Sequence, residues 1–294
     1  MVLGLAGCGG TSAEETAPKE EDKAVEAPAE APEEPAEEAL EETAEETGEE
    51  KELIVFAAAS MTETLTEIGE KYMDENPNVQ ITFNFDSSGT LKTQIQEGAP
   101  CDLFISAGQK QMNQLDITAD PEVNTEGLDF VDDSTRINIL ENKVTLCVST
   151  GSENAPKTFD EMAAALKDGS ILMAMGNSDV PVGQYTQKIL AYYELSEEEL
   201  AAAGTISYGS NVKEVTTQIQ EGSVDCGVIY CTDAFSAELE IADYATAEMC
   251  GQVIYPAAVL KSAADPKTAQ AFLDYMQEED SMKIFEKVGF SPVQ

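Results

Sequence analysis

From Leu53 onward, short apolar runs alternate with amphipathic stretches, and this rhythm limits the chain to a few folds. The runs at 53–59, 79–85 and 102–106 have the length of strands, and residues 61–72 carry apolar side chains at helical spacing. A strand–helix–strand order of this kind is typical of a parallel sheet that helices cover on both faces. We therefore predict an α/β fold whose sheets are mainly parallel and flanked by helices.

A second unit with the same rhythm follows, with strand-like runs at 143–149, 171–175 and 224–230. The hexapeptide TQIQEG occurs at 93–98 and again at 217–222, each time shortly before an aspartate and an apolar run. We interpret this repeat as two equivalent helix–turn–strand units, one in each of two lobes. Two such lobes create a cleft, and the carboxyl ends of parallel strands face it.

Three residues mark predicted helix starts in the second half of the chain. Thr158 and Ser196 are each followed three residues later by a glutamate, which is the capping-box pattern. Asp265 is followed by Pro266, a residue favoured at the first helical position. We expect a helix to begin directly after each of these three caps.

The N-terminal part of the chain differs from the rest in composition. Residues 9–52 hold 18 of the 57 acidic residues and consist mostly of Glu, Ala, Thr and Pro. Such a segment cannot bury enough apolar surface to offset its chain entropy, so we predict a disordered acidic linker. Residues 1–8 end in LAGC, which resembles the lipobox of bacterial lipoproteins. We interpret them as a truncated signal segment and expect a lipid anchor on Cys8; the alternative is a cytosolic protein in which Cys8 has no role.

Charge and residue usage exclude several classes of function. The net charge is −41, and a single arginine, Arg136, accompanies the lysines, so clustered cations for nucleic-acid phosphates are lacking. The absence of histidine removes the commonest general base and metal ligand, and we predict neither catalytic residues nor a metal site. No C-x-x-C spacing occurs, and we expect core thiols at Cys101, Cys147, Cys226, Cys231 and Cys250.

Three loops stand where strands give way to helices at the predicted cleft. They are AAAS at 57–60, DSSGT at 86–90 and GSN at 209–211. Each offers backbone N–H groups at a helix N-terminus, where partial positive charge favours an anion. Each serine alone is equally consistent with an ordinary helix cap, and we expect Ser60 to act both as a cap and as a ligand. Together the loops predict a tight anion site made of small, uncharged residues.

Five segments of the chain resemble the molybdate-binding proteins of ABC importers, in the same order and at fitting intervals. Their most specific matches are the small-residue run AAAS, the pattern SSGTL and the stretch GAPCDLFIS. The resemblance extends over nearly all of the chain from residue 52, and it is carried by residues 52–68, 83–112, 177–190, 227–234 and 284–290.

The resemblance implies the two-lobed type II periplasmic binding fold, with a ligand cleft between the lobes. We assign residues 53–135 and 231–294 to lobe 1, and residues 136–230 to lobe 2. The resemblance also implies a monomeric, extracytoplasmic solute-binding protein that has no cofactor and no enzymatic activity. Such a protein would capture molybdate, and we expect tungstate too, and deliver it to an ABC transporter permease, while a lipid anchor on Cys8 holds it at the membrane.

The resemblance places the family's ligand contacts at five positions of this chain. Ser60 and Ser88 would supply hydroxyl and backbone N–H donors, whereas Val182 and Val212 would supply backbone N–H groups only. Tyr230 would supply its phenol; without the resemblance, a core aromatic at a strand end would be the simpler interpretation. Five uncharged donors can satisfy a dianion without the cost of a buried counter-ion.

Three alternatives stay open at this point. The donor loops do not encode the radius of an anion, so sulfate or phosphate is the first alternative ligand. An enzyme of the same fold would need an acid or base, and Asp86 and Asp179 are the only carboxylates close by in the sequence. A surface-adhesion lipoprotein is suggested only by the acidic linker. In the DSSGT loop, Gly89 stands in place of a third serine, which removes one hydroxyl.

Overall fold

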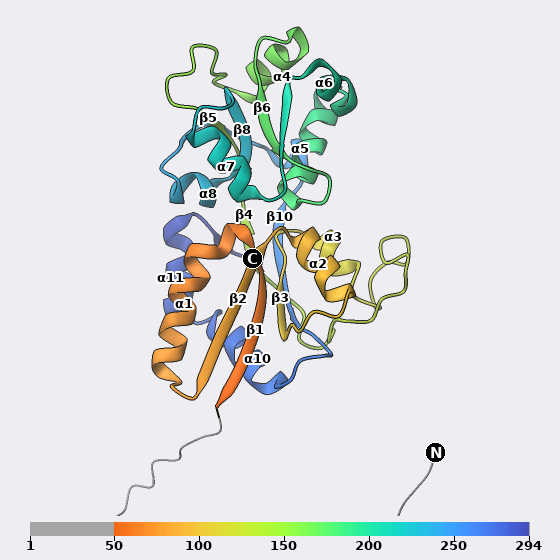
Figure 1. The fold of residues 1–294 in the computed structure, drawn as a ribbon, viewed down its shortest axis with the longest axis vertical. Coiled ribbons are helices and arrows are strands. Elements are labelled where there is room, and N and C mark those ends of the chain that lie inside the picture. Colours follow the sequence, from red (N-terminus) through yellow and green to blue (C-terminus); the bar gives the residue numbers. More distant parts are fainter. Residues whose placement is uncertain (1–49, 294) are drawn as a thin grey trace, which may run out of the picture. The chain divides into compact units, whose positions relative to one another are not determined.

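The computed structural model describes residues 50–293, which form two lobes, each built on one β-sheet (Figure 1). The first lobe has a six-stranded sheet with the order β11-β4-β10-β3-β1-β2. In it, β1 runs parallel to β2 and β3, whereas β10 and β11 run antiparallel to their neighbours. The strands are β1 (Lys51–Ala58), β2 (Val79–Asp86), β3 (Leu103–Ile105), β4 (Ile137–Asn142), β10 (Val253–Val259) and β11 (Ser291–Pro292).

The second lobe has a five-stranded sheet with the order β7-β6-β8-β5-β9. Here β6 runs parallel to β7 and β8, and β5 runs antiparallel to β8 and β9. The strands are β5 (Val144–Val148), β6 (Met173–Gly176), β7 (Ile206–Gly209), β8 (Cys226–Tyr230) and β9 (Glu240–Tyr244). The predicted two-lobed α/β fold is confirmed, but both sheets are mixed rather than mainly parallel. An apolar run shows that a strand is buried, not in which direction it runs.

The sheets also place the lobe boundaries differently from the sequence prediction. β4 pairs in the first sheet although its residues lie beyond 135, and β9 pairs in the second although its residues lie beyond 230. The chain crosses from one sheet to the other at Lys143, between β4 and β5, and returns before β10. In the sequence, the residues of β4 and β5 form one nearly continuous strand-like run. This pattern does not indicate that its two halves belong to different sheets.

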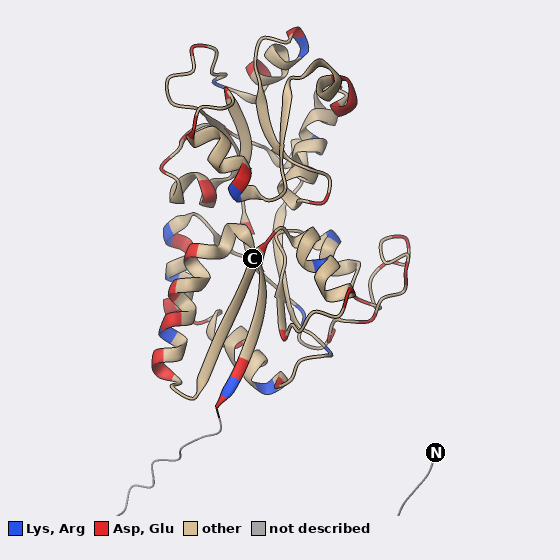
Figure 2. Cartoon of the chain, in the orientation of Figure 1, with Lys and Arg blue, Asp and Glu red and all other residues tan. Residues whose placement is uncertain are grey.

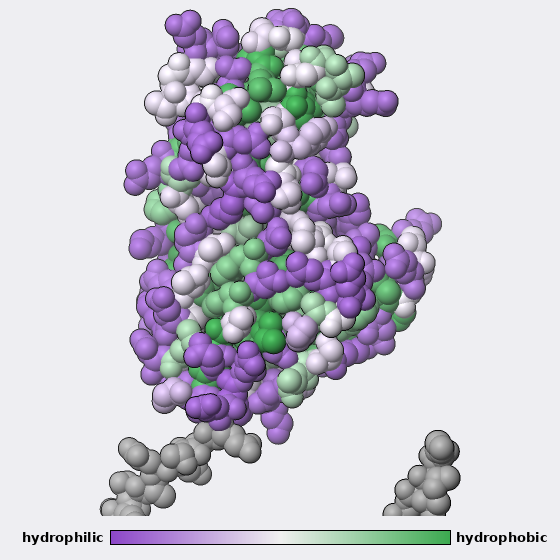
Figure 3. All heavy atoms as spheres, viewed as in Figure 1, coloured by the Kyte–Doolittle hydropathy of each residue, from purple (hydrophilic) through white to green (hydrophobic). Residues whose placement is uncertain are grey.

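Helices cover both faces of the first sheet, and the burial of successive β1 residues on opposite sides shows this. Val55 and Ala57 pack in one hydrophobic cluster, and Phe56 between them packs in another with Leu91 and Phe104. Hydrophilic side chains cover much of the outer surface, with apolar ones visible over β1 and β2 (Figure 3). The helices are α1 (Thr62–Glu75), α2 (Ser88–Gln96), α3 (Gln109–Asn113), α10 (Pro266–Tyr275) and α11 (Glu279–Val288), with a short 3-10 turn η1 (Ala59–Met61) before α1.

The second lobe carries its helices in the same way, and the predicted helix starts are confirmed. Thr158 and Ser196 accept hydrogen bonds from backbone N–H groups three residues on, at 3.1 and 3.3 Å. In the first lobe, Asp265 caps α10 and accepts from the N–H groups of Lys267 and Thr268. The helices are α4 (Phe159–Asp168), α5 (Pro181–Tyr192), α6 (Glu197–Ala203), α7 (Val212–Gln220), α8 (Cys231–Ser236) and α9 (Ala247–Cys250). The two TQIQEG copies end α2 and α7, and each leads into a sheet strand, β3 or β8.

The segment before β1 is only partly within the described residues. The predicted signal segment 1–8, the anchor at Cys8 and residues 9–49 of the predicted linker lie outside them. The predicted linker end at residue 52 is two residues too late, because β1 begins at Lys51 and pairs there with Val79. None of the helices within 50–293 is long and apolar enough to span a membrane.

The described cysteines are buried free thiols, as the sequence predicts. Burial raises the pKa of the Cys147 thiol to about 11, so this side chain stays protonated at neutral pH. Cys231 is the first residue of α8 and does not extend strand β8. Within residues 50–293, no group of three or more Asp, Glu or Cys side chains is arranged to hold a metal ion.

Candidate functional site

A small pocket lies between the two lobes, and all five sequence-predicted ligand residues line it. Its cavity volume is about 10 Å³, close to the minimum that a single buried water needs. The first lobe contributes Ala58, Ala59, Ser60, Asp86, Ser87, Ser88 and Ala107, and the second contributes Val180, Pro181, Val182, Val212 and Tyr230.

The N-termini of three helices, α2, α5 and α7, meet at this pocket. Ser88 and Val212 are the first residues of α2 and α7, and Val182 is the second residue of α5, so their N–H groups have no partner inside the helix. The caps Ser87 and Asn211 accept from the third N–H of their helices and leave the first turn open. The site therefore presents several backbone donors from both lobes toward one point.

Tyr230, the last residue of β8, contributes a hydroxyl that has no hydrogen-bond partner among residues 50–293. Its side chain is 1% exposed, and its Oη is buried without a donor or acceptor nearby. Its ring packs edge-on between those of Tyr185 and Tyr255, with centroids 6.4 and 5.9 Å away. Burial raises the pKa of Tyr230 well above its usual value, so the phenol keeps its hydrogen. An unpaired buried hydroxyl is costly, and here it faces a pocket where a ligand can pair it.

Ser88 is held so that its hydroxyl hydrogen is available. The backbone N–H of Ala107 donates to Ser88 Oγ at 2.9 Å, and the serine side chain is fully buried. An N–H group can only donate, so the serine oxygen is the acceptor in this contact. The one hydrogen of the hydroxyl is then left to point elsewhere, and the pocket adjoins it.

Ser60 lies in the 3-10 turn η1 and does not cap α1. The N-cap of α1 is Met61, which makes no side-chain cap bond, so the prediction of a capping role for Ser60 is wrong. The Ser60 hydroxyl instead lies 2.8 Å from the hydroxyl of Tyr255, a residue of β10. Ala58 and Ala59 beside it are buried and offer only methyl groups, which leaves room for a ligand against the backbone.

No lysine, arginine or histidine is among the lining residues, and one carboxylate is. Asp86 Oδ1 accepts from the N–H of Ser87 at 2.7 Å and from the side-chain amide of Asn211 at 3.3 Å. These two donors offset part of its charge, and the second one joins the lobes. Figure 2 shows most charged residues on outer helices and loops, with a blue and red pair at the start of α7.

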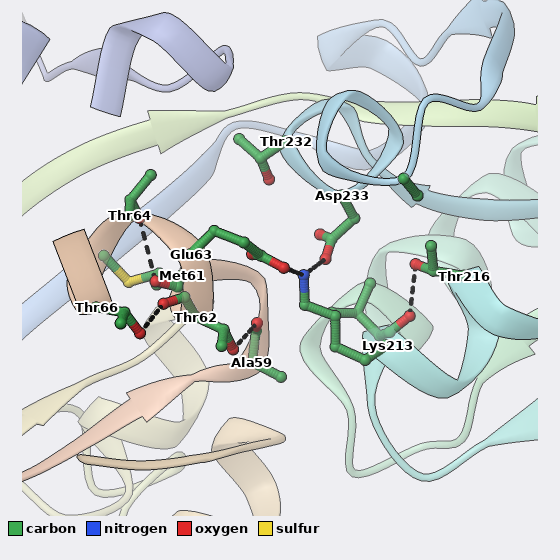
Figure 4. Close-up of polar contacts among 12 residues, drawn as sticks. Ala59, Met61, Thr62, Glu63, Thr64, Thr66, Lys213, Thr216, Thr232 and Asp233 are labelled. Atoms are coloured by element: carbon green, nitrogen blue, oxygen red, sulfur yellow. Dashed lines mark hydrogen bonds and ion pairs between the residues drawn. The ribbon is translucent and has the colours of Figure 1, made fainter. Parts of the chain in front are cut away.

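A cluster of three charged residues lies beside the pocket and joins α7 to α1 (Figure 4). Lys213 Nζ donates to both carboxylate oxygens of Glu63, at 2.7 and 2.8 Å, and lies 3.3 Å from Asp233 Oδ1. The Asp233 side chain is 0% exposed, and its oxygens accept no hydrogen bond from described residues. Burial works against the charged state of Lys213, but the two carboxylates outweigh it and raise the lysine pKa.

Two residues behind the pocket were not found from the sequence. Tyr255 and Asn142 are hydrogen-bonded to each other at 3.1 Å, and Tyr255 contacts Ser60. In the sequence, Tyr255 is one apolar residue of the strand-like run QVIYPAAVL, and Asn142 comes at the end of the unpredicted strand β4. Both contacts join residues more than 100 positions apart, so no local pattern indicates them.

Two lobes closed over a pocket of hydroxyl and backbone donors, with one carboxylate in its lining, are typical of a binding protein for a small solute. A family model of bacterial extracellular solute-binding proteins matches residues 53–291. The chain belongs to this family and is a solute-binding protein of ABC transporters.

Curated relatives agree with this assignment. The chain is 32% identical to a Bacillus subtilis protein named "Putative ABC transporter substrate-binding lipoprotein YvgL", with 81% of this chain and 86% of that protein covered. It is 29% identical to the molybdate-binding protein ModA of Haemophilus influenzae, with 82% and 90% covered. Both names describe binding proteins, and the first assigns its protein to an ABC transporter.

Solved structures show the same fold. The periplasmic molybdate-binding protein of Azotobacter vinelandii superposes with a TM-score of 0.69 at 22% identity, with 82% of this chain and 100% of that chain covered. The sulfate-binding protein SubI of Mycobacterium tuberculosis superposes with a TM-score of 0.65 at 16% identity, with 83% and 88% covered. At these identities the match establishes the architecture, and the ligand must be argued from the site.

The buried carboxylate of Asp233 should make stability depend on pH. Burial raises its pKa from 3.8 to about 6, although Lys213 acts in the opposite direction. A carboxyl whose pKa is higher in the folded state stabilises the fold at low pH and loses that contribution as the pH rises through 6. Between about pH 4.5 and pH 8, we expect wild type to lose about 2 kcal/mol of unfolding free energy relative to Asp233→Asn.

Urea denaturation of both proteins at several pH values measures this difference. The exposed Asp74, changed to Asn, is the matched control and should give a difference that stays nearly constant with pH. A constant difference for Asp233→Asn as well would show that Asp233 titrates normally in the folded protein.

Proposed function

We propose that this protein captures molybdate outside the cytoplasm and delivers it to an ABC transporter permease. The observation that carries the proposal is the buried hydroxyl of Tyr230, which has no hydrogen-bond partner among residues 50–293. The pocket that Tyr230 lines also contains helix N-termini, serines, small apolar residues and the carboxylate of Asp86. Apart from the Asp86 carboxylate, whose Oδ1 already accepts two hydrogen bonds, such a pocket offers mainly hydrogens, which suits a ligand whose surface consists only of oxygen atoms. The ligand contacts would be the hydroxyls of Ser60, Ser88 and Tyr230 and the backbone N–H groups of Val182 and Val212.

The arrangement of donors favours a compact anion with oxygens on all sides. Donors approach from the first lobe through Ser60 and Ser88 and from the second through Val182, Val212 and Tyr230. A tetrahedral oxyanion presents acceptors in all of these directions at once, whereas a sugar or an amino acid also carries hydrogen-bond donors, which would face the donors of the pocket. Charge-assisted hydrogen bonds to a dianion are roughly twice as strong as neutral ones, so neutral donors suffice.

The choice among tetrahedral oxyanions rests on the relatives. Several proteins with 28 or 29% identity over most of this chain are named molybdate-binding. Tungstate carries the same charge and shape as molybdate, and we propose it as a second ligand. Sulfate is the main alternative, because the fold is shared with a sulfate-binding protein and uncharged donors bind sulfate by the same chemistry.

We also propose that a lipid on Cys8 anchors the protein to the outer face of the cell membrane. The support is the LAGC sequence before the acidic segment, together with the name of the Bacillus subtilis relative, which calls that protein a lipoprotein. The acidic segment would then let the lobes reach the permease from the anchor.

The contacts between the lobes support capture by closure. Asn211 on one lobe donates to Asp86 on the other, and Lys213 reaches Glu63 across the same boundary. Gly89 in α2 comes so close to the loop before α5 that a Cβ atom there would lie 2.2 Å from the carbonyl oxygen of Asp179. The glycine that removes a hydroxyl from the DSSGT loop thus leaves space for the facing lobe.

Titration calorimetry tests the proposed ligand directly. We expect molybdate and tungstate to bind saturably at micromolar protein, and sulfate and phosphate to bind much more weakly, because donors spaced for the larger anions would form long hydrogen bonds to the smaller ones. Absence of heat with molybdate would contradict the proposal, and preferential binding of sulfate would favour the alternative.

Removing the Tyr230 hydroxyl should separate binding from stability. Tyr230→Phe deletes a group without a protein partner, so the unliganded protein should be as stable as wild type or slightly more stable. Molybdate should lose one charge-assisted hydrogen bond, which corresponds to a loss of affinity of about 10- to 150-fold. Tyr72→Phe, in α1, is the matched control and should leave the affinity unchanged. An unchanged affinity in Tyr230→Phe would remove this residue from the ligand set.

A side chain at Gly89 should weaken ligand binding only because it hinders closure of the two lobes. In Gly89→Ala, the new methyl group meets the backbone of Asp179, and overpacking of this kind costs about 1–3 kcal/mol, or about 5- to 150-fold in affinity. Alanine favours a helix, so thermal stability of the unliganded protein should not fall. Calorimetry and thermal denaturation measure the two effects, and wild-type affinity in this variant would contradict the closed geometry as the binding form.

A further inference from the structure

A buried row of three side chains stands behind the pocket, where Asn142, Tyr255 and Ser60 are joined by hydrogen bonds. The amide nitrogen of Asn142 lies 3.1 Å from the Tyr255 hydroxyl, which lies 2.8 Å from the Ser60 hydroxyl. The three side chains are 3%, 0% and 4% exposed. Of the three, Ser60 alone lines the pocket. The direction of each hydrogen bond in the row follows from the chemistry of its members.

The orientation of the Asn142 amide is fixed by the backbone. The N–H of Lys143, which can only donate, points at Asn142 Oδ1 at 2.8 Å, and the Cys231 thiol donates to the same oxygen at 3.2 Å. Turning the amide around would place its NH2 group against the N–H of Lys143. The NH2 group therefore faces the other way, where it donates to Tyr255 and to Thr232.

The direction at Tyr255 follows from that at Asn142. The tyrosine oxygen accepts from Asn142, and an NH2 group cannot accept the tyrosine hydrogen in return. The remaining described partner of the hydroxyl is Ser60 Oγ, so Tyr255 donates to Ser60. Burial raises the pKa of Tyr255 well above its usual value, which keeps this hydrogen in place. The opposite direction would leave a fully buried hydroxyl hydrogen unpaired, which is costly.

The Ser60 hydroxyl then has the same hydrogen-bonding arrangement as the Ser88 hydroxyl. Each serine oxygen accepts a hydrogen bond from behind, from the Tyr255 hydroxyl in one case and from the Ala107 N–H in the other. Each serine hydrogen is left for the pocket. A hydroxyl that accepts one bond is also a stronger donor for the next, because hydrogen bonds in a chain polarise one another.

We propose that Tyr255 is a positioning residue: it donates to Ser60 Oγ, so that the Ser60 hydroxyl donates its own hydrogen to the bound oxyanion. Asn142 sets the direction of this row of hydrogen bonds, which we call the relay. The inference rests on the proposed function of the pocket and adds two residues that do not touch the ligand. The relay also connects the proposed ligand site to the segments where the chain passes between the lobes. Asn142 is the last residue of β4, directly before the crossing at Lys143, and Tyr255 lies on the neighbouring strand β10.

A double-mutant cycle tests the relay. In the wild-type background, Tyr255→Phe should weaken molybdate binding about tenfold, because the Ser60 hydroxyl loses the donor that fixes it. In the Ser60→Ala background, the same change should have little effect, because the group through which Tyr255 acts is absent. Equal losses in both backgrounds would overturn the proposal, since they would show that Tyr255 acts on the fold and not through Ser60.

Stability measurements accompany the cycle because both single changes disturb buried groups. Ser60→Ala leaves the Tyr255 hydroxyl without its acceptor and should lower stability, whereas the double variant should recover part of that loss. Tyr72→Phe is again the control for removing a buried phenol elsewhere and should change neither binding nor its dependence on Ser60. The affinities are compared only under conditions where every variant is folded.

Reversing the relay gives a second, independent test. In Asn142→Asp, a carboxylate faces the tyrosine and accepts its hydrogen, so Tyr255 would accept from Ser60 and draw the serine hydrogen away from the pocket. The new charge also repels the anion, but repulsion acts whether or not the tyrosine hydroxyl is present. We therefore expect Asn142→Asp to weaken binding several-fold more in wild type than in Tyr255→Phe, and equal losses in the two backgrounds would overturn the proposed direction.

The wild-type titration separates failure of this inference from failure of the proposed function. If wild type binds sulfate or phosphate in preference to molybdate, the proposed ligand is wrong, and the cycle is run with the preferred anion. If wild type binds none of the four anions, the relay has no ligand to serve, and both proposals are overturned. If wild type binds molybdate but the cycle is additive, only the role of Tyr255 is overturned.

Discussion

Every donor in the pocket has to be left with a hydrogen that the protein itself does not use, and most of the local structure follows from this constraint. Ser88 Oγ accepts from the Ala107 N–H, and in the proposed relay Ser60 Oγ accepts from Tyr255. The Tyr230 hydroxyl makes no hydrogen bond to any residue that the structure describes. The helix caps Ser87 and Asn211 take the third N–H of α2 and α7 but not the first. In a chain with a net charge of −41, attraction of the proposed oxyanion would come from these oriented groups in direct contact, because salt screens distant carboxylates within about 8 Å.

The same constraint explains why the site is divided between the lobes. A single helix N-terminus offers donors from one direction, so enclosing a small anion takes several helices that end at one point. The two TQIQEG units supply two of them, because α2 and α7 hold equivalent positions in the two lobes and both start at the pocket. Closing the lobes brings the two N-termini together, and Gly89 removes the side chain that would otherwise prevent this approach.

The parts of this structure that could be predicted from the sequence are those encoded locally. Strand periodicity located β1, β2 and β8, and the caps at Thr158, Ser196 and Asp265 follow from short patterns. Strand direction and lobe membership are decided by pairing between distant segments, so the mixed sheets were not foreseen. The Tyr255 contact is of the same kind, since 195 residues separate the tyrosine from Ser60. Ser60 was misjudged as a cap because the turn η1 places Met61 at the start of α1.

Lys213 shows how the pocket can stay free of positive charge although a lysine follows directly after Val212. Its ammonium group is held between Glu63 and Asp233 and is not among the pocket lining. A free ammonium in the pocket would attract every small anion through a force that depends weakly on geometry. Short hydrogen bonds from fixed donors depend strongly on the distance to each oxygen, so they can distinguish anions of equal charge by size. Pairing the lysine with carboxylates at the lobe boundary therefore supports closure and leaves selectivity to the hydrogen bonds.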